Sequence, residues 1–252
     1  MGICSEGQTN PEGLGPAPNT NVAEKLTKPR KMKLYGNYFN SDTRTVMTLI
    51  KISGIEHEFQ EVDIFLGKHK DIDYLAKNPC GTIPMLTDQD SQILGNISTF
   101  VNYLSTKPKL QSYMPRAHSA KIEQYINWHL SVLRPCIQRM IKVIVGPKAF
   151  GHEEYSGDEI EAAKSAFCKD ILGRIEGMLN NQMFLISAQE PTAVDIIFYN
   201  EISTALMLTR IKWLEQRYPN IFEWITLMGT TIQELDAMDE ILGEIVDKYI
   251  LE

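Results

Sequence analysis

The step from Ile83 to Pro84 is the feature of this chain that most directly indicates chemistry. It stands in residues 78–86, after a short apolar strand, a helical segment and a second strand. An X–Pro bond adopts the cis form at a cost of only about 0.5–1 kcal/mol. A cis bond here would turn the N–H and C=O of Ile83 outward, where an extended peptide can pair with them. The segment therefore predicts a site for a peptide-like ligand.

A thiol carried by such a ligand needs a hydrogen-bond donor beside its sulfur. A thiol with a pKa near 8.5 is mostly protonated at neutral pH, whereas the thiolate is the nucleophile. Lowering this pKa by two units requires about 2.7 kcal/mol of preferential thiolate stabilisation. One or two hydrogen bonds to a charge supply that amount, so a polar side chain must stand where the sulfur binds.

Composition and charge exclude several other functions. The chain has 252 residues and a formal net charge of −7, whereas a nucleic-acid surface needs concentrated Lys and Arg. No apolar run approaches the roughly 20 residues of a membrane span, and no secretory signal is visible. The four cysteines form no C-x-x-C pair and have no zinc-ligand spacing, which predicts reduced thiols and no metal; they are Cys4, Cys80, Cys136 and Cys168.

The polar and apolar patterns divide the chain into three parts. Residues 1–32 are rich in Gly, Pro, Asn and Thr, which predicts a flexible tail. Residues 33–108 alternate strands and helices: we expect helices over 43–53, 71–77 and 97–106, a strand over 57–64 and a hairpin around 88–91. Residues 116–252 predict an all-α domain, with helices at about 117–146, 157–181, 192–208, 213–228 and 231–250.

Taken together, these residues resemble the cytosolic glutathione transferases, and within them the theta-like class. The resemblance covers about residues 33–240. It implies an α/β thioredoxin-like N-terminal domain, an all-α C-terminal domain and a cytosolic homodimer. The segments that carry it are Leu34-Tyr35, residues 41–46, residues 62–69 ending at His69, Asn78-Pro79, Ile83-Pro84, Phe184-Leu185, residues 191–195 and Tyr218-Pro219.

The resemblance also implies a role for individual residues. Asn40 stands where the theta-like class has the Ser that donates to the glutathione sulfur, four residues before Arg44. Ser41, one residue later, and Tyr38 are alternative donors; equally, Asn40 or Ser41 could simply cap the helix that begins near Asp42. His69 would meet the glycine carboxylate of glutathione, and the backbone of Ile83 beside Pro84 would pair with its cysteinyl part.

Three side chains depart from the family pattern. Asn96 and Ile97 stand where the family has a Glu-Ser or Gln-Ser pair that holds the γ-glutamyl group, and Thr82 replaces a Lys. Asn96 keeps an acceptor, but Ile97 offers no side-chain hydrogen bond. Each lost charge-assisted contact costs about 1.5–3 kcal/mol. We therefore expect a divergent glutathione site and weakened activity.

A short signal stands at the start of the tail. Gly2 and Cys4 resemble the acceptors of a dually acylated N-terminus, but Glu6 occupies the position where Ser or Thr is usual. Two acyl chains followed by the basic cluster of residues 25–33 would anchor a protein to a membrane surface. The alternative is an ordinary flexible extension.

Two functions follow from these features. The first is a detoxifying glutathione transferase that joins the glutathione thiolate to a small apolar electrophile, without a metal. The second is a non-catalytic scaffold or interaction subunit with the same fold, in one version tethered to a membrane through its N-terminus. Fold alone does not separate the two, because function depends on the side chains of the site. A thiol oxidoreductase using Cys80 is disfavoured, since Cys80 is not at the first strand-to-helix turn.

Overall fold

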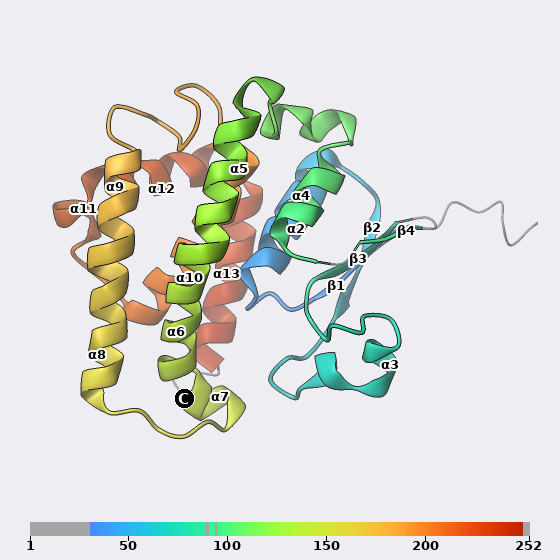
Figure 1. Ribbon diagram of the computed structural model, residues 1–252, viewed down its shortest axis with the longest axis horizontal. Coiled ribbons are helices and arrows are strands. Elements are labelled where there is room, and N and C mark those ends of the chain that lie inside the picture. Colours follow the sequence, from blue (N-terminus) through green and yellow to red (C-terminus); the bar gives the residue numbers. More distant parts are fainter. Residues whose placement is uncertain (1–30, 89–90, 94, 249–252) are drawn as a thin grey trace, which may run out of the picture. The chain divides into compact units, whose positions relative to one another are not determined.

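A computed structural model describes residues 31–88, 91–93 and 95–248 of the chain (Figure 1). Residues from Lys31 onward form one unit, so its α/β and helical halves are described together. The predicted acylation sites Gly2 and Cys4 lie outside the described residues, as does most of the predicted tail.

The described part of the N-terminal half is built on a sheet with the strand order β2-β1-β3-β4. Its strands are β1 (Met32–Gly36), β2 (His57–Glu61), β3 (Met85–Asp88) and β4 (Ser91–Ile93). β1 pairs in parallel with β2 and antiparallel with β3, and β3 pairs antiparallel with β4. The carboxyl ends of β1 and β4 therefore point to the same edge of the sheet, while β3 begins at that edge.

Two helices cover one face of this sheet (Figure 1). Strand β1 alternates buried and half-buried residues, so that Met32 and Leu34 face α2 (Ser41–Ser53) and α4 (Ile97–Leu104). Leu34 is fully buried in one core with Val46 and Ile50 of α2. The opposite face carries Tyr35, which packs near the short helix α3 (Ile72–Leu75). The predicted helices and strands of this half are present: α2 begins earlier than predicted, at Ser41, whereas β2, α3 and α4 are shorter than predicted.

The second half is helical, as predicted. The expected helix at 117–146 is α5 (Ser119–Trp128) and α6 (Arg134–Ile144) joined by a π-helical segment, His129–Leu133, and is followed by α7 (Gly146–Phe150). The next is α8 (Gly157–Ala166) and α9 (Gly173–Met178), joined by a second π-helical segment, Phe167–Leu172. The rest are α10 (Ala193–Thr209), α11 (Leu214–Arg217), α12 (Pro219–Thr231) and α13 (Glu234–Val246).

A capping box starts α10, as the residues Thr192 and Asp195 predict. The fully buried Asp195 carboxylate accepts hydrogen bonds from the Thr192 N–H at 2.8 Å and from the Leu185 N–H at 2.8 Å. It also accepts from the indole N–H of Trp224 at 3.2 Å. This carboxylate therefore fixes the start of α10 and ties the preceding loop and α12 to it.

Among the described helices, none combines the length and the apolar character that crossing a bilayer requires.

Candidate functional site

The sheet register brings the predicted site residues to one edge. Tyr35 of β1 pairs with Met85 of β3, so the chain just after Tyr35 lies beside the Ile83–Pro84 step. That peptide bond is cis, the form in which Ile83 would turn its N–H and C=O outward. β4 runs in the direction of β1 and ends near the same edge, where α4 begins. The loop before α2, the cis proline and the start of α4 therefore surround one region, named the proline edge below.

The loop before the cis proline is held by buried polar side chains. The Thr82 carbonyl accepts from the Tyr74 hydroxyl at 2.7 Å and from the Asn78 side-chain amide at 2.7 Å. Asn78 is fully buried, so its role is to shape this loop. Gly81 has a φ of 60°, and a Cβ at this position would approach the His69 carbonyl to 3.3 Å. These contacts keep His69 next to the loop and leave the Thr82 side chain exposed.

Asn40 caps α2 through its carboxamide oxygen. This oxygen accepts from the Thr43 N–H at 2.8 Å and from the Thr43 hydroxyl at 3.2 Å. Because the oxygen is turned toward the helix, the amide NH₂ of the same group points away from it. The capping role and the donor role are therefore compatible: the cap removes the carbonyl oxygen that would repel a thiolate and presents the N–H groups.

Ser41, the alternative donor, lies in a different environment from Asn40, and its donor role stays a prediction. Its side chain is 7 % exposed. Its hydroxyl is directed at the buried carboxylate of Glu201 and contributes to the low pKa of that group. Tyr38 packs against Phe59, with ring centroids 4.6 Å apart. Burial, followed by the charge of Glu61, raises the pKa of Tyr38, so its hydroxyl stays protonated.

The two residues at the start of α4 differ in their environment. Asn96 is exposed and caps α4, with its carboxamide oxygen accepting from the Ser98 N–H at 3.1 Å. Ile97 is fully buried in the core that α4 shares with the sheet. The Ile97 side chain therefore packs in the core, and a part for this residue at the γ-glutamyl end of the site stays a prediction.

His69 lies in the 3₁₀ turn Lys68–Lys70 and is half-buried. Its Nδ1 is buried and has no hydrogen-bond partner among the described residues. Burial, followed by the charge of Lys70, lowers the pKa of the imidazole below 6.5. His69 is therefore neutral at pH 7 in the free protein, with one ring nitrogen available for a new hydrogen bond.

A buried ionic network, which sequence analysis did not predict, joins the two halves. Arg134 of α6 forms ion pairs with Asp42 of α2 and with Glu201 of α10. His129 is fully buried, and its Nε2 lies 2.9 Å from a Glu201 oxygen. Burial opposes the ionisation of Glu201, but Arg134, His129 and Ser41 outweigh it and lower its pKa to about 2. Ligand atoms of Asp42, His129 and Glu201 lie within 4.8 Å of one another, as in a metal site, but the Arg134 guanidinium already supplies the cation.

Arg44 links this junction to the proline edge. The fully buried guanidinium donates to the Tyr38 carbonyl at 2.6 Å and the Phe39 carbonyl at 3.2 Å. On its other side it donates to the side-chain oxygen of Asn200 at 3.1 Å and to the Thr204 hydroxyl at 2.6 Å. Helix α10 therefore braces the loop that carries Asn40. A sequence signal for this bracing existed: Asn200 and Glu201 are polar residues inside an otherwise apolar helix, where buried polar groups need partners.

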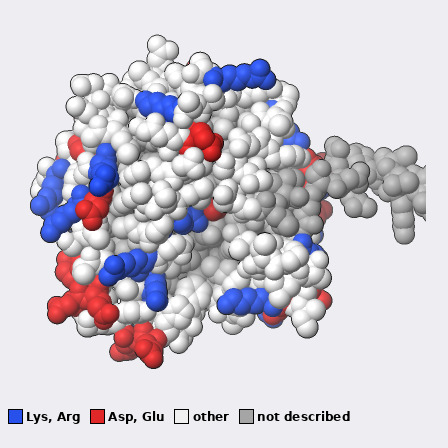
Figure 2. Space-filling model, viewed as in Figure 1, with Lys and Arg blue, Asp and Glu red and all other residues white. Residues whose placement is uncertain are grey.

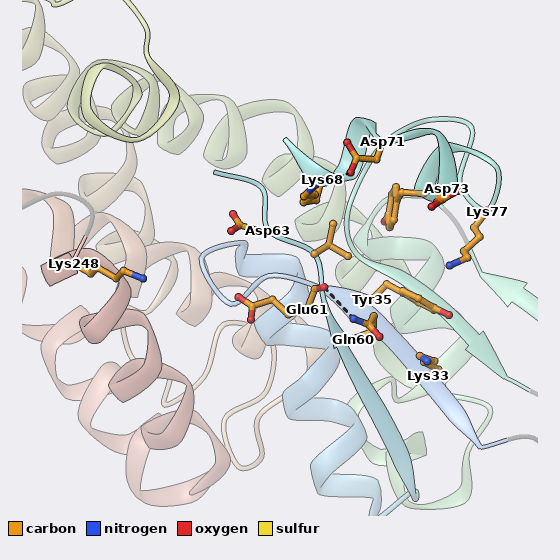
Figure 3. Close-up of a pocket in the computed structure, with 12 residues that line it drawn as sticks. Lys33, Tyr35, Gln60, Glu61, Asp63, Lys68, Asp71, Asp73, Lys77 and Lys248 are labelled. Carbon is orange, nitrogen blue, oxygen red and sulfur yellow. Dashed lines mark hydrogen bonds and ion pairs between the residues drawn. The ribbon is translucent and has the colours of Figure 1, made fainter. Parts of the chain in front are cut away.

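The face of the sheet that α2 and α4 do not cover carries a cavity of about 670 Å³ (Figure 3). Figure 3 shows Tyr35 and Gln60 side by side on neighbouring strands, with Lys77 near the Tyr35 ring. Lys33 and Lys77 each place their ammonium within 5.5 Å of the ring centroid. No predicted site residue lines this cavity, which is therefore distinct from the proline edge.

The chain is similar to known proteins in one domain, in much of its sequence and in its fold. Residues 30–95 match the family described as glutathione S-transferase, N-terminal domain. Human glutathione S-transferase theta-2 is 24 % identical over 180 residues, which cover 70 % of this chain and 72 % of the relative. Glutathione S-transferase F9 of Arabidopsis thaliana is 36 % identical over 80 residues, 32 % of this chain and 36 % of that protein.

A solved structure with the same fold is that of human glutathione transferase theta-2 in complex with glutathione and an unknown ligand. Its TM-score is 0.78 at 22 % sequence identity, and the match covers 86 % of this chain and 90 % of that one. The predicted fold class, a thioredoxin-like domain followed by a helical domain, is thereby confirmed. The domain match over residues 30–95, the theta-class relatives and the shared fold support the predicted resemblance to the theta-like cytosolic glutathione transferases.

Proposed function

We propose that this protein is a glutathione transferase that conjugates the glutathione thiolate to a small apolar electrophile. The observation that carries the proposal is the orientation of Asn40. Its carboxamide oxygen is held by Thr43, so its N–H groups face away from the helix at the proline edge. A hydrogen bond from one of these N–H groups to sulfur stabilises the thiolate more than the thiol, which lowers the thiol pKa.

The reaction begins when bound glutathione loses its thiol proton to water. The Asn40 N–H then donates to the thiolate. The sulfur electron pair attacks the electrophilic carbon of the second substrate and forms a C–S bond, while the bond to a leaving group such as chloride breaks and its electron pair departs with the halide. Charge and atoms balance without a metal or a redox partner.

Glutathione recognition would be shared between backbone and neutral side chains. In this proposal the backbone of Ile83 pairs with the cysteinyl part and His69 receives the glycine carboxylate. The amino group of the γ-glutamyl part meets Asn96, whose capping oxygen has a second lone pair, and Thr82 lies beside the glycine end. In this arrangement no buried cation binds either carboxylate of glutathione. We therefore expect a dissociation constant for glutathione in the millimolar rather than the micromolar range, a difference of about 4 kcal/mol in binding free energy.

An apolar cluster next to Asn40 supports the second substrate class. Phe39 belongs to a cluster with side chains of α6, α7, α10 and α13. The ring of Phe39 lies 5.6 Å from that of Phe65, which stacks on Phe150 at 5.3 Å. Phe65 and Phe150 are only partly buried, so they offer apolar surface beside the sulfur site.

Calorimetric titration with glutathione, paired with a chloro-dinitrobenzene conjugation assay, tests the proposal. We expect binding at millimolar glutathione and measurable conjugation. In Asn40→Ala the conjugation rate should fall by tenfold or more, since one hydrogen bond to a charge is lost. The matched control is Asn127→Ala, an exposed asparagine on α5. No heat of binding in the wild type, or equal rates in the two variants, would remove the proposal.

A non-catalytic scaffold is the second candidate, and one observation favours it. The centre of the apolar cluster is closed: Phe39, Val145 and Leu242 are each at most 4 % exposed. Little room then remains for an electrophile unless Phe65 or Phe150 moves. Glutathione binding without conjugation of any of a panel of aryl halides and epoxides would favour the scaffold.

Assembly and location belong to the same proposal. We infer a cytosolic homodimer from the family, which sedimentation equilibrium tests by mass. Peripheral membrane contact would require acylation of Gly2 and Cys4. Metabolic labelling with a myristate analogue tests it, and an unlabelled wild type would exclude it.

A further inference from the structure

A cavity in the helical half lies between the π-helical segment Phe167–Leu172 and the turn from α10 to α11. Its volume is about 450 Å³, which is within the range of small-molecule sites. Its lining shares no residue with the predicted glutathione site. We propose that this cavity binds a small planar organic anion, with the anionic group among the cations of the lining and the ring against Trp213. The proposal goes beyond the glutathione chemistry and does not depend on it.

The lining is basic although the chain is acidic. One carboxylate, Glu161, lines the cavity beside five cationic side chains, which are Lys164, Lys169, Arg210, Lys212 and Arg217. Figure 2 shows Lys and Arg side chains on the side where α9 and α11 lie in Figure 1, while acidic side chains gather near the far end of α8. Within a chain of net charge −7, this local excess of positive charge favours an anion.

The acidic neighbours do not cancel this excess. Arg210 lies 3.9 Å from Asp247, but both side chains are more than half exposed, so their interaction is weak. Glu161 is exposed on the first part of the helix that forms one wall. The other four cations form no ion pair with a carboxylate of the described residues, which leaves their charge directed at solvent or at a ligand.

An aromatic wall supports a ligand with a ring. The Arg217 guanidinium lies over the Trp213 indole, 5.2 Å from its centroid. The Tyr218 ring lies 6.1 Å from that indole, and its hydroxyl donates to the Cys168 carbonyl at 2.6 Å. The indole is therefore half-buried and held between the Arg217 guanidinium and the Tyr218 ring. A fixed indole beside guanidinium favours a flat π-system carrying negative charge over a compact inorganic ion.

Two segments that line the cavity, the π-helical segment Phe167–Leu172 and the end of α10, have unusual backbone conformations. One wall is π-helical and contributes Cys168 and Lys169; single π-helical turns inside α-helices are rare and frequently occur at functional sites. On the other wall Arg210 ends α10 in the left-handed conformation, with φ 51° and ψ 40°, which is uncommon for a residue other than glycine or asparagine. Two independent departures from regular helix meet at this one cavity.

Calorimetry with the full chain tests the proposal, using 2-naphthyl phosphate as the probe and neutral 2-naphthol and inorganic phosphate as comparisons. We expect naphthyl phosphate to bind at least tenfold more tightly than either. Arg217→Gln should weaken that binding tenfold or more, because it removes a charge-assisted contact. The matched control, Arg116→Gln, changes an exposed arginine elsewhere and should leave binding unchanged.

Cys168 provides a second readout, because its half-buried thiol lies in the lining. Naphthyl phosphate should slow alkylation of the Cys168 peptide, measured by mass spectrometry, and naphthol should not. AMP in the same assays distinguishes a nucleotide from a simple aryl phosphate: binding of AMP that Arg217→Gln abolishes assigns a nucleotide, and its failure beside naphthyl phosphate assigns the aryl phosphate. Equal binding of naphthyl phosphate and naphthol, or equal effects of the two Arg variants, would overturn the proposal.

Discussion

The first turn of α2 has two sides that are built differently. Toward the proline edge it presents one neutral carboxamide, Asn40, which is half-buried. Toward α10 it presents Asp42 and Arg44, both buried and both bonded to side chains of the helical half. The buried side carries formal charges that need their partners, whereas the open side carries polar groups that water can also satisfy.

The buried side of this turn therefore serves mainly the stability of the fold, whereas the side at the proline edge is available for ligand binding. Changing one member of the buried set leaves a partner unsatisfied out of water, so that set is expected to dominate stability. Changing a group at the proline edge removes a ligand contact and little else. Of the residues that depart from the family pattern, Asn40, Asn96 and Thr82 lie on the open side, whereas Ile97 is buried in the core.

The largest effect is expected from Arg134→Met, which removes the cation between Asp42 and Glu201. Two buried carboxylates would then lose the guanidinium that pairs with both, a type of change that costs about 3–5 kcal/mol. Urea unfolding followed by circular dichroism measures the free energy of unfolding. Arg116→Met, at an exposed arginine, is the control, and equal midpoints for the two variants would show that the network contributes nothing.

Arg134→Met should also reverse the way in which ionisation of Glu201 affects the stability of the fold. In the wild type the pKa of Glu201 is lowered from 4.5 to about 2, so its stabilising contribution is complete above pH 4.5 and is lost as the pH falls toward 2. Without Arg134, burial should raise this pKa above 4.5, and protonation would then relieve the variant. We therefore expect the stability deficit of Arg134→Met to narrow as the pH falls from 7 toward 4.5; a constant deficit would contradict the ion-pair account.

Gly36→Ala is expected to have the next largest effect on stability. Gly36 contacts Thr43, which is buried in the core and also holds the Asn40 side chain at the proline edge. A Cβ on Gly36 would come within 2.5 Å of the Thr43 methyl group and 2.7 Å of its hydroxyl. Thr43 is fully buried and is the partner of Asn40, so its displacement would strain the core and loosen the cap. Overpacking of this kind costs about 1–3 kcal/mol. Thermal unfolding measures it, with Gly157→Ala as a control because that position has open space.

The fold was largely predictable because its signals are local. Gly54 ends α2 in the left-handed conformation, and Thr192 with Asp195 starts α10, as their spacing predicts. The bond before Pro84 is cis, a form that an X–Pro step allows and that the resemblance implies. The π-helical segments inside the predicted helices at 117–146 and 157–181 were missed, because an apolar stripe looks nearly the same with one extra residue in a turn.

The candidate site was less predictable because it depends on where side chains point. Asn40 and Ser41 are adjacent polar residues, and spacing alone left both as donors. The fold turns Asn40 toward the proline edge and Ser41 toward Glu201, 160 residues later in the chain. Ile97 was assigned by register with the family, but an isoleucine on the inner side of an amphipathic helix packs in the core. A single sequence can show that a polar residue such as Glu201 stands in an apolar helix, but it does not show which distant residue is its partner.

Asn40→Ala and Asn40→Ser separate the two roles of residue 40, capping α2 and donating a hydrogen bond to the glutathione sulfur. Alanine removes both roles, so we expect a loss of about 1 kcal/mol in the free energy of unfolding and a higher pKa of bound glutathione. Serine also caps well and brings a hydroxyl donor, so stability should remain near wild type while the thiol pKa stays low. Ultraviolet absorption of the thiolate measures that pKa; identical pKa values in the two variants would show that residue 40 does not contact the sulfur.

The smallest effect is expected at His69, in the pH dependence of binding. Burial and then Lys70 hold the pKa of this imidazole below 6.5 in the free protein. A ligand carboxylate beside it favours the charged form and raises the pKa in the complex. Binding is then coupled to proton uptake, so affinity should rise a few-fold as the pH falls from about 8 to about 6. S-methylglutathione is the right probe, because it has no thiol to titrate. His69→Asn keeps a polar side chain but does not titrate, so its affinity should be flat over that range. A wild type as flat as this variant would place the glycine carboxylate elsewhere.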